Sequence, residues 1–293
     1  MNKDKTILKT LLLGSFFASL SAMLGGSTFV FTRYVVDSID PFTLSFLRYG
    51  LTGLILFLLS ISVYMNKKFA KADLIPMCFL GLAMITLFPN FMALGLEHTT
   101  AARAGLLYAT MPLCTIIIAY FFNIEKITLN KSLAVLLAIL GVSFCMSERV
   151  DNNFQDTLKG DFLMMIGVLS ASCFTVFSGK YLKKYGNIPV MIFVILIGTI
   201  LNLIISMIFG NSIISLLEIN KFEAAALLML IIPGGVVMMY CWGKALQLIS
   251  PTQAAISLGF NPLTAILLGS IILNEEITFK SVSYTHLRAH ETE

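Results

Sequence analysis

The side chains that could take part in chemistry stand singly inside long apolar runs of the chain. They are Arg48, Asn90, Tyr108, Tyr240, Trp242 and Asn261. Amide and hydroxyl tips combined with aromatic rings suit the binding of a small amphipathic solute in an apolar pocket. We therefore take these residues, together with Pro112 and Pro262, as candidate substrate-binding residues. For Tyr240 and Trp242, an interfacial aromatic belt is an equally good interpretation.

The sequence lacks the familiar patterns of catalysis and metal binding. Every carboxylate falls in a predicted loop or at the end of an apolar run, and there is no HExxH, GxSxG or mid-run pair of acids. The five cysteines lie inside apolar runs without CxxC spacing. Because intramembrane catalysis needs such groups, we expect no enzyme activity, no metal site and no cofactor. A membrane-embedded enzyme or channel-like protein without a recognisable motif remains the alternative.

Arg48 is the one charged candidate, and it lies well inside an apolar run. It is about six residues into that run, or about 9 Å at 1.5 Å per residue. Burial of its charge at full depth costs about 2.5 to 3.5 kcal/mol on insertion scales. Three interpretations stay open: a snorkelling side chain at the outer face, a contact for a substrate carboxylate, or a structural pair with Asp37 or Asp40.

Proline and glycine interrupt several apolar runs near their centres. These breakers are Gly25, Gly26, Pro112, Pro233, Gly234, Gly235 and Pro262. Irregular backbone at that depth is tolerated where it lines a cavity or is buried by neighbouring helices. Breakers at corresponding positions of two repeats point to a central binding site. The alternative is a packing kink without ligand contact.

Small residues spaced one helical turn apart form a second pattern. The stripe comprises Ala101, Gly105 and Ala109 in one run, and Ala255 and Gly259 in another. Such stripes let two helices approach closely. We therefore expect the fourth and ninth predicted spans to pack against each other, with Gly105 and Gly259 as packing residues.

These side chains must be positioned by membrane-spanning helices. Of the 293 residues, 57% are hydrophobic and 12% are charged, roughly half the charged fraction of a soluble domain. The apolar runs cover residues 11–35, 42–64, 74–96, 101–122, 132–146, 162–177, 189–209, 222–246 and 252–273. A spanning helix needs about 20 residues, and lipid leaves backbone groups no partner outside a helix. The fold class is therefore an all-α integral membrane protein.

The chain also repeats itself. A shift of 150 positions matches Pro112 with Pro262 and Glu125 with Glu275, and a shift of 148 matches Pro41 with Pro189. The first unit, residues 1–147, contains five predicted helices. Because five is an odd number, the second unit, residues 160–282, starts on the opposite side of the membrane. We expect two inverted five-helix repeats.

Several of these segments carry a family resemblance. They are Pro41 with Leu47-Arg48-Tyr49, the stretch from Gly95 to Pro112, Phe122-Asn-Ile-Glu125-Lys-Ile-Thr128, Leu140-Gly141-Val142, and Asn261-Pro262 through Glu275-Glu276-Ile277-Thr278. Over about residues 11–281 the chain resembles the EamA repeat of the drug/metabolite transporter superfamily. The resemblance implies ten helices in two repeats, and transport, usually export, of small metabolites such as amino acids.

Charge placement predicts the orientation and the partners. Lys and Arg gather more on the side of the N-terminus, which favours a cytoplasmic N-terminus in the inner membrane. Lys3, Lys5 and Lys9 also suit a signal peptide, but the following apolar run continues well past a signal core, so we expect a retained helix. No basic patch suggests nucleic acid. The expected partners are a small-molecule substrate and the lipid bilayer, and the architecture is compatible with a homodimer.

The C-terminal residues do not fit this frame. The repeat demands a tenth helix starting near Val282, but Ser283 to Glu293 are too polar to span a membrane. This stretch looks like translated read-through of a sequencing adapter. We therefore expect nine complete helices, a truncated tenth, a non-native tail at residues 283–293, and no metal binding by His286 or His290.

Overall fold

The computed structural model describes residues 2–126, 133, 154–210 and 219–274. Within these ranges the chain forms helices and connecting turns and contains no strand. Eight helical stretches there are long and apolar enough to cross a membrane. The all-α membrane class is thus confirmed. The predicted span at 132–146 and the predicted tail at 283–293 lie, apart from Leu133, outside the described residues.

The first half supplies four of these spans. Its helices are α1 (Asn2–Val35), α2 (Pro41–Leu59), α3 (Ile61–Met65), α4 (Lys71–Gly81), the π-helical turn η1 (Leu82–Leu87), α5 (Phe88–Leu96), α6 (Ala101–Tyr108) and α7 (Met111–Phe121). Asp40 begins α2, because its carboxylate accepts the amide hydrogens of Phe42 and Thr43. The predicted breakers Gly25 and Gly26 do not interrupt α1, which is continuous.

The second half supplies the other four spans. Its helices are α9 (Phe154–Tyr185), α10 (Asn187–Phe209), α11 (Lys221–Ile231), the π-helical turn η3 (Ile232–Val237), α12 (Met238–Leu248), α13 (Pro251–Ile256), the 3₁₀ turn η4 (Ser257–Gly259) and α14 (Phe260–Ile272). Asn220 and Ser250 begin α11 and α13 with capping boxes.

Two spans are interrupted by a π-helical turn, and the two turns occupy matching positions. The bounds of η3 fall 150 residues after those of η1. In η1 the Phe88 amide bonds the Ala83 carbonyl, five residues back, and in η3 the Met238 amide bonds the Pro233 carbonyl. Proline contributes to both, since Pro89 and Pro233 lack an amide hydrogen. Each π turn leaves carbonyl oxygens that need another donor.

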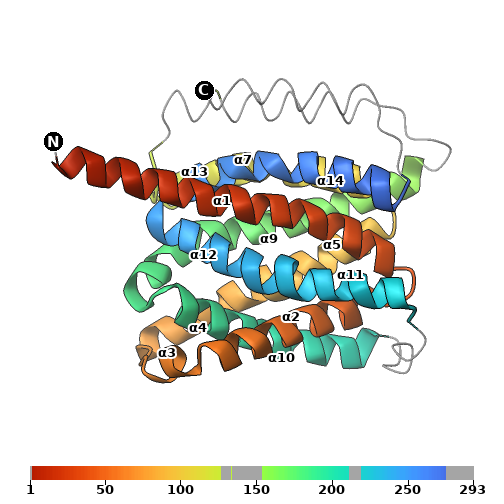
Figure 1. Ribbon diagram of the computed structural model, residues 1–293, viewed down its shortest axis with the longest axis horizontal. Helices are drawn as coiled ribbons and strands as arrows, with labels where there is room; N and C mark the ends of the chain where they lie inside the picture. The colour runs from red at the N-terminus through yellow and green to blue at the C-terminus, as the bar shows by residue number, and fades with distance from the viewer. Residues whose placement is uncertain (1, 127–132, 134–153, 211–218, 275–293) are drawn as a thin grey trace.

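The helices run roughly along one common direction (Figure 1). Helix α1 packs against α12 and α14, α2 packs against α10, and α5 packs against α9. Helix α6 also packs against α14. Because these pairs join one half of the chain to the other, the interior lies between the halves.

Candidate functional site

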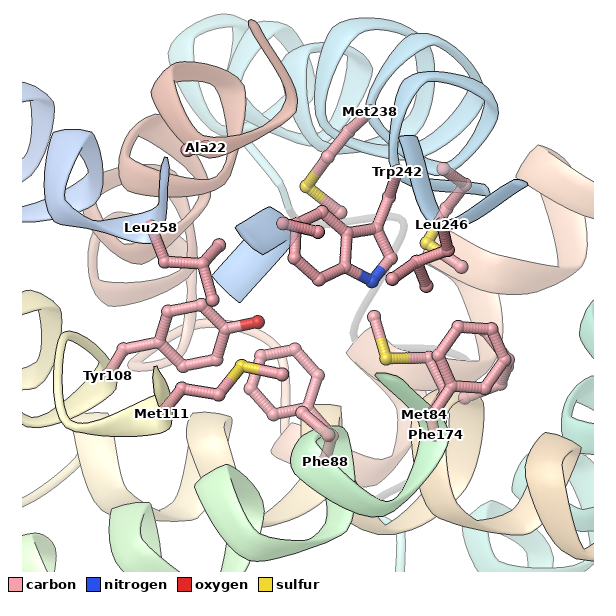
Figure 2. Packing of buried hydrophobic residues seen from close by; sticks show 14 of the residues in the cluster. Ala22, Met84, Phe88, Tyr108, Met111, Phe174, Met238, Trp242, Leu246 and Leu258 are labelled. Atoms are coloured by element: carbon pink, nitrogen blue, oxygen red, sulfur yellow. The ribbon is translucent and has the colours of Figure 1, made fainter. Parts of the chain in front are cut away.

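A small cavity lies at the centre of the helix bundle, between elements of both halves. Its lining residues are Ser21, Gly25, Thr28 and Phe29 of α1, Met84 of η1, Phe88 of α5, Tyr108 of α6, Met238, Met239 and Trp242 of α12, Leu258 of η4, and Asn261 of α14. Figure 2 shows Tyr108, Phe88, Met84, Trp242 and Leu258 gathered around this space. The cavity therefore has aromatic and thioether walls.

The cavity is nearly closed in this conformation. Its volume is about 20 Å³, which is room for about one water molecule. A metabolite of amino-acid size enters only if the surrounding helices move apart. The central space in this structure is therefore too small to hold such a solute.

Among the lining residues, Asn261 stands out because its side-chain amide is buried and makes no hydrogen bond to a described residue. Its exposed fraction is 0%, and neither Oδ1 nor Nδ2 has a hydrogen-bond partner in the part of the chain that the structure describes. A buried polar group without a partner costs about 1 to 3 kcal/mol. Trp242 Nε1 is in the same situation. Unmatched donors and an acceptor at one cavity are what a polar ligand requires.

Tyr108 forms the third polar tip. Its ring packs edge-on against Phe29, with ring centres 5.5 Å apart, and tilted against Phe88 at 5.3 Å. These contacts fix the ring, and its hydroxyl points into the space beside Trp242 and Phe88 (Figure 2). The structure therefore brings Tyr108, Trp242 and Asn261, three of the predicted candidates, to one cavity.

Arg48 lies behind the cavity wall rather than in it. Its exposed fraction is 2%, so it does not snorkel to the surface. Its Nη2 donates to the carbonyl of Gly234 in η3 at 2.9 Å, and its guanidinium lies 4.9 Å from the centre of the Tyr49 ring. The predicted partner Asp37 instead bonds Arg33 at 3.1 Å. Arg48 supplies the donor that the π turn η3 lacks.

Asn90 has a similar structural task. Its Nδ2 donates to Asn202 Oδ1 at 2.9 Å and to the Thr86 carbonyl at 2.8 Å. Asn202 in turn donates to the Ile85 carbonyl at 2.8 Å, which is the carbonyl that Pro89 cannot bond across one helical turn. Asn90 does not line the cavity. Sequence reasoning missed Asn202, although a lone amide in the apolar run 189–209 was the signal available.

The remaining candidates also lie outside the cavity lining. Tyr240 is 36% exposed and packs edge-on against Phe17, with ring centres 6.2 Å apart. Pro112 and Pro262 are buried near the starts of α7 and α14. They lie just after the interruptions of their spans.

The glycines mark close helix approaches around the site. A Cβ on Gly105 would lie 3.0 Å from the Ala265 Cβ, and one on Gly25 would lie 3.1 Å from Asn261 Oδ1. A Cβ on Gly26 would overlap the Asn261 backbone, and one on Gly234 would lie 2.6 Å from Thr28 Cγ2. Gly235 meets Thr52 in the same way, whereas Gly259 ends η4. Gly25, Gly26 and Gly105 hold α1 and α6 against α14.

A second, polar hollow of about 250 Å³ opens at one end of the bundle. It is lined by Arg33, Glu97, His98, Thr99, Thr100, Arg103 and Thr157. Burial raises the pKa of the Glu97 carboxyl, while His98 and Lys159 oppose this shift. The hollow lies nearer the end of the bundle than the cavity does. On α1 the hollow residue Arg33 follows the cavity residue Thr28, and on α6 the hollow residue Arg103 precedes the cavity residue Tyr108. We call the hollow the vestibule.

An ion pair closes the wall of the vestibule. Arg103 Nε donates to Asp161 Oδ1 at 2.9 Å, and Arg103 Nη2 donates to Asp161 Oδ2 at 2.6 Å. Both side chains are largely buried, with 13% and 7% exposed. This two-point contact joins α6 to α9, and therefore one half of the chain to the other.

The chain matches a known protein family and several known transporters. The model of the EamA-like transporter family matches residues 12–147 and again residues 158–287. An uncharacterized transporter of Archaeoglobus fulgidus is 27% identical over 266 residues, covering 89% of each chain. The uncharacterized transporter YoaV of Bacillus subtilis is 24% identical, over 89% of this chain and 88% of that protein. For the uncharacterized inner membrane transporter YedA of Escherichia coli, identity is 24% over 91% and 84%.

A solved crystal structure of another protein shares the fold. Its TM-score is 0.72 at 16% identity, with 97% of this chain and 94% of that chain covered.

Proposed function

The chain belongs to the EamA-like transporter family, and we propose that it is a secondary transporter that exports a small metabolite such as an amino acid. A membrane transporter is what the family and the named relatives support in general. The direction, the substrate class and the mechanism are our proposal. The observation that carries it is the central cavity, where Asn261 and Trp242 have buried polar atoms without partners.

The composition of the cavity favours a solute without net charge. The lining residues carry no ionisable acid or base apart from the Tyr108 phenol. An amide, an indole N–H and a hydroxyl can each hydrogen-bond a polar tip of a solute, while the aromatic and methionine side chains contact its apolar body. A zwitterionic amino acid with an apolar side chain meets these requirements.

Movement of the two halves relative to each other would open the cavity to one side at a time. The π turns η1 and η3 interrupt the spans that meet the cavity through Met84 and Met238, and such turns are frequent at functional sites. At the vestibule end, the Arg103–Asp161 pair holds α6 against α9. We propose that this pair breaks when the cavity opens toward the vestibule.

The inner membrane and a cytoplasmic N-terminus are also part of the proposal. The relative YedA is named as an inner membrane transporter, and the excess of Lys and Arg on the N-terminal side supports the orientation.

Transport in vesicles tests the proposal. The purified protein would be reconstituted into liposomes loaded with one labelled amino acid at a time, and efflux would be measured. Asn261→Leu should reduce efflux at least tenfold, because it removes the two amide atoms of Asn261 that have no partner among the described residues at the cavity. Ser270→Leu is the matched control on the same helix, since among the described residues Ser270 Oγ donates only to the Leu267 carbonyl of its own helix, at 3.0 Å. Equal efflux by both variants would overturn the site.

A further inference from the structure

An apolar seam lies on the outside of the bundle, where α4 and η1 pack against α9. A groove of about 480 Å³ runs along this seam. Its walls are apolar side chains, including Ile75 and Phe79 of α4, Leu82 and Ala83 of η1, and Phe177 of α9. Ile75 and Phe79 are 69% and 65% exposed, so the groove opens toward lipid. The volume is that of a typical ligand pocket.

One end of the groove carries a cation. Lys180 lines the groove five residues before the C-terminal end of α9, or about 7.5 Å from it. Its Nζ lies 4.7 Å from the centre of the Tyr181 ring, and no ion pair of Lys180 occurs among the residues that the structure describes. At this depth a lysine reaches the boundary between acyl chains and headgroups.

Asp73, the acidic residue near Lys180, already has hydrogen-bond partners. Asp73 Oδ2 accepts from Lys184 Nζ at 2.7 Å and from the Tyr185 hydroxyl at 2.6 Å. The groove lining contains no Asp or Glu. Lys180 and the nearby Lys183 therefore leave positive charge at this end of the groove.

We propose that this groove binds one anionic phospholipid of the surrounding bilayer. An acyl chain lies along the wall formed by Phe79, Ala83 and Phe177, and the headgroup phosphate meets Lys180. A phospholipid supplies an apolar chain and a negative charge at the spacing that the groove offers, which is the chemistry of basic pockets between membrane helices. An apolar protein helix would fill the groove but leave Lys180 without a counter-charge.

The lipid also contacts a moving part of the proposed transport mechanism. Leu82, Ala83 and Leu87 belong to η1, and Met84 of the same turn lines the central cavity. Lipid binding itself does not depend on the transport proposal.

Native mass spectrometry of the full chain in detergent tests this site. Phosphatidylglycerol and phosphatidylcholine of identical acyl chains would be titrated separately. The wild-type chain should retain one phosphatidylglycerol with at least tenfold higher affinity than phosphatidylcholine. Lys180→Gln should remove this preference, and Ala83→Phe, which fills the groove, should weaken binding of both lipids.

Lys68→Gln is the matched control, because Lys68 is exposed in the loop before α4 and lies outside the groove lining. It should leave the preference unchanged. Two results would overturn the proposal: a preference for phosphatidylglycerol that survives Lys180→Gln, or a mass of two chains that Ala83→Phe converts to one. The second result would assign the groove to a second copy of the chain. The mass spectrometry experiment contains no transported solute. Its result therefore does not depend on the outcome of the transport assay.

Discussion

At the scale of single residues, position at the cavity separates the site from its surroundings. Asn261 and Trp242 line the cavity with polar atoms that have no partner among the described residues. Arg48 Nε and Asn90 Oδ1 are also without a partner in the described part of the chain, but both residues lie outside the lining and donate to backbone carbonyls near the π turns. All four were predicted as binding residues, because each is a polar or aromatic residue in an apolar run. The sequence does not show which carbonyls lose their amide partner, so it cannot separate the two groups.

Tyr240 and Trp242 illustrate what spacing can decide. They are two residues apart on α12, and residues at that spacing do not share a helix face. Trp242 lines the cavity, and Tyr240 packs against Phe17 on α1. Their opposite placement follows from helix geometry, but which of the two faces inward depends on how α12 packs.

Tyr108→Phe is the sharpest test at the residue scale. The substitution removes one oxygen and keeps the ring that packs against Phe29 and Phe88. Because no hydrogen bond of this hydroxyl occurs among the described residues, unfolding stability should change by less than about 0.5 kcal/mol. The KM of the transported solute should rise about tenfold, equivalent to about 1.4 kcal/mol. Thermal unfolding and efflux kinetics measure the two effects, and an unchanged KM would contradict the role of Tyr108.

At the scale of elements, the eight described spans were predictable and their interruptions were only partly so. Length and hydropathy determine a spanning helix, and each of the predicted runs with described coordinates falls on such a span. Pro233-Gly234-Gly235 correctly marked an irregular segment in η3. In contrast, Gly25 and Gly26 serve close packing in an unbroken helix, and the interruption at η1 was not predicted.

The π turn η3 depends on a side chain from α2. Arg48→Met should destabilise the protein by about 1 to 3 kcal/mol, because the buried Gly234 carbonyl loses its donor. Arg33→Met is the control, since the Arg33–Asp37 pair is exposed and such pairs contribute about 0 to 1 kcal/mol. Thermal unfolding in detergent compares the two variants. Equal losses of stability would show that η3 does not need Arg48.

The contact between α6 and α14 depends on the absence of a side chain at Gly105. Gly105→Leu should destabilise the bundle by about 1 to 3 kcal/mol, because even a Cβ lies within 3.0 Å of Ala265 and 3.4 Å of Pro262. Gly179→Leu is the matched control, because the nearest atom to its Cβ is the Leu246 oxygen at 3.6 Å. The same unfolding assay applies, and a larger loss for Gly179→Leu would contradict the close approach at Gly105.

At the scale of the whole molecule, a different ion pair lies at each end of the bundle. Arg103 and Asp161 close the vestibule end, and Lys184 bonds Asp73 at the start of α4. Because the chain crosses the bundle once between Asp73 and Glu97, these pairs lie at opposite ends. Their placement depends on packing between helices of different halves, which hydropathy and the repeat do not determine.

Breaking one pair should open the cavity from one end only. In a cysteine-free background, Thr28→Cys places a thiol at the cavity, and a membrane-impermeant maleimide reports its access from each side. Asp161→Asn should raise labelling from the vestibule side about tenfold, because a shift of about 1.4 kcal/mol between two states changes their ratio by that factor. Asp73→Asn removes a carboxylate at the other end and should leave labelling from the vestibule side unchanged or lower. If both variants raise labelling from the vestibule side equally, the two ion pairs affect general stability and not access to the cavity. That result would contradict the proposal that the cavity opens to one side at a time.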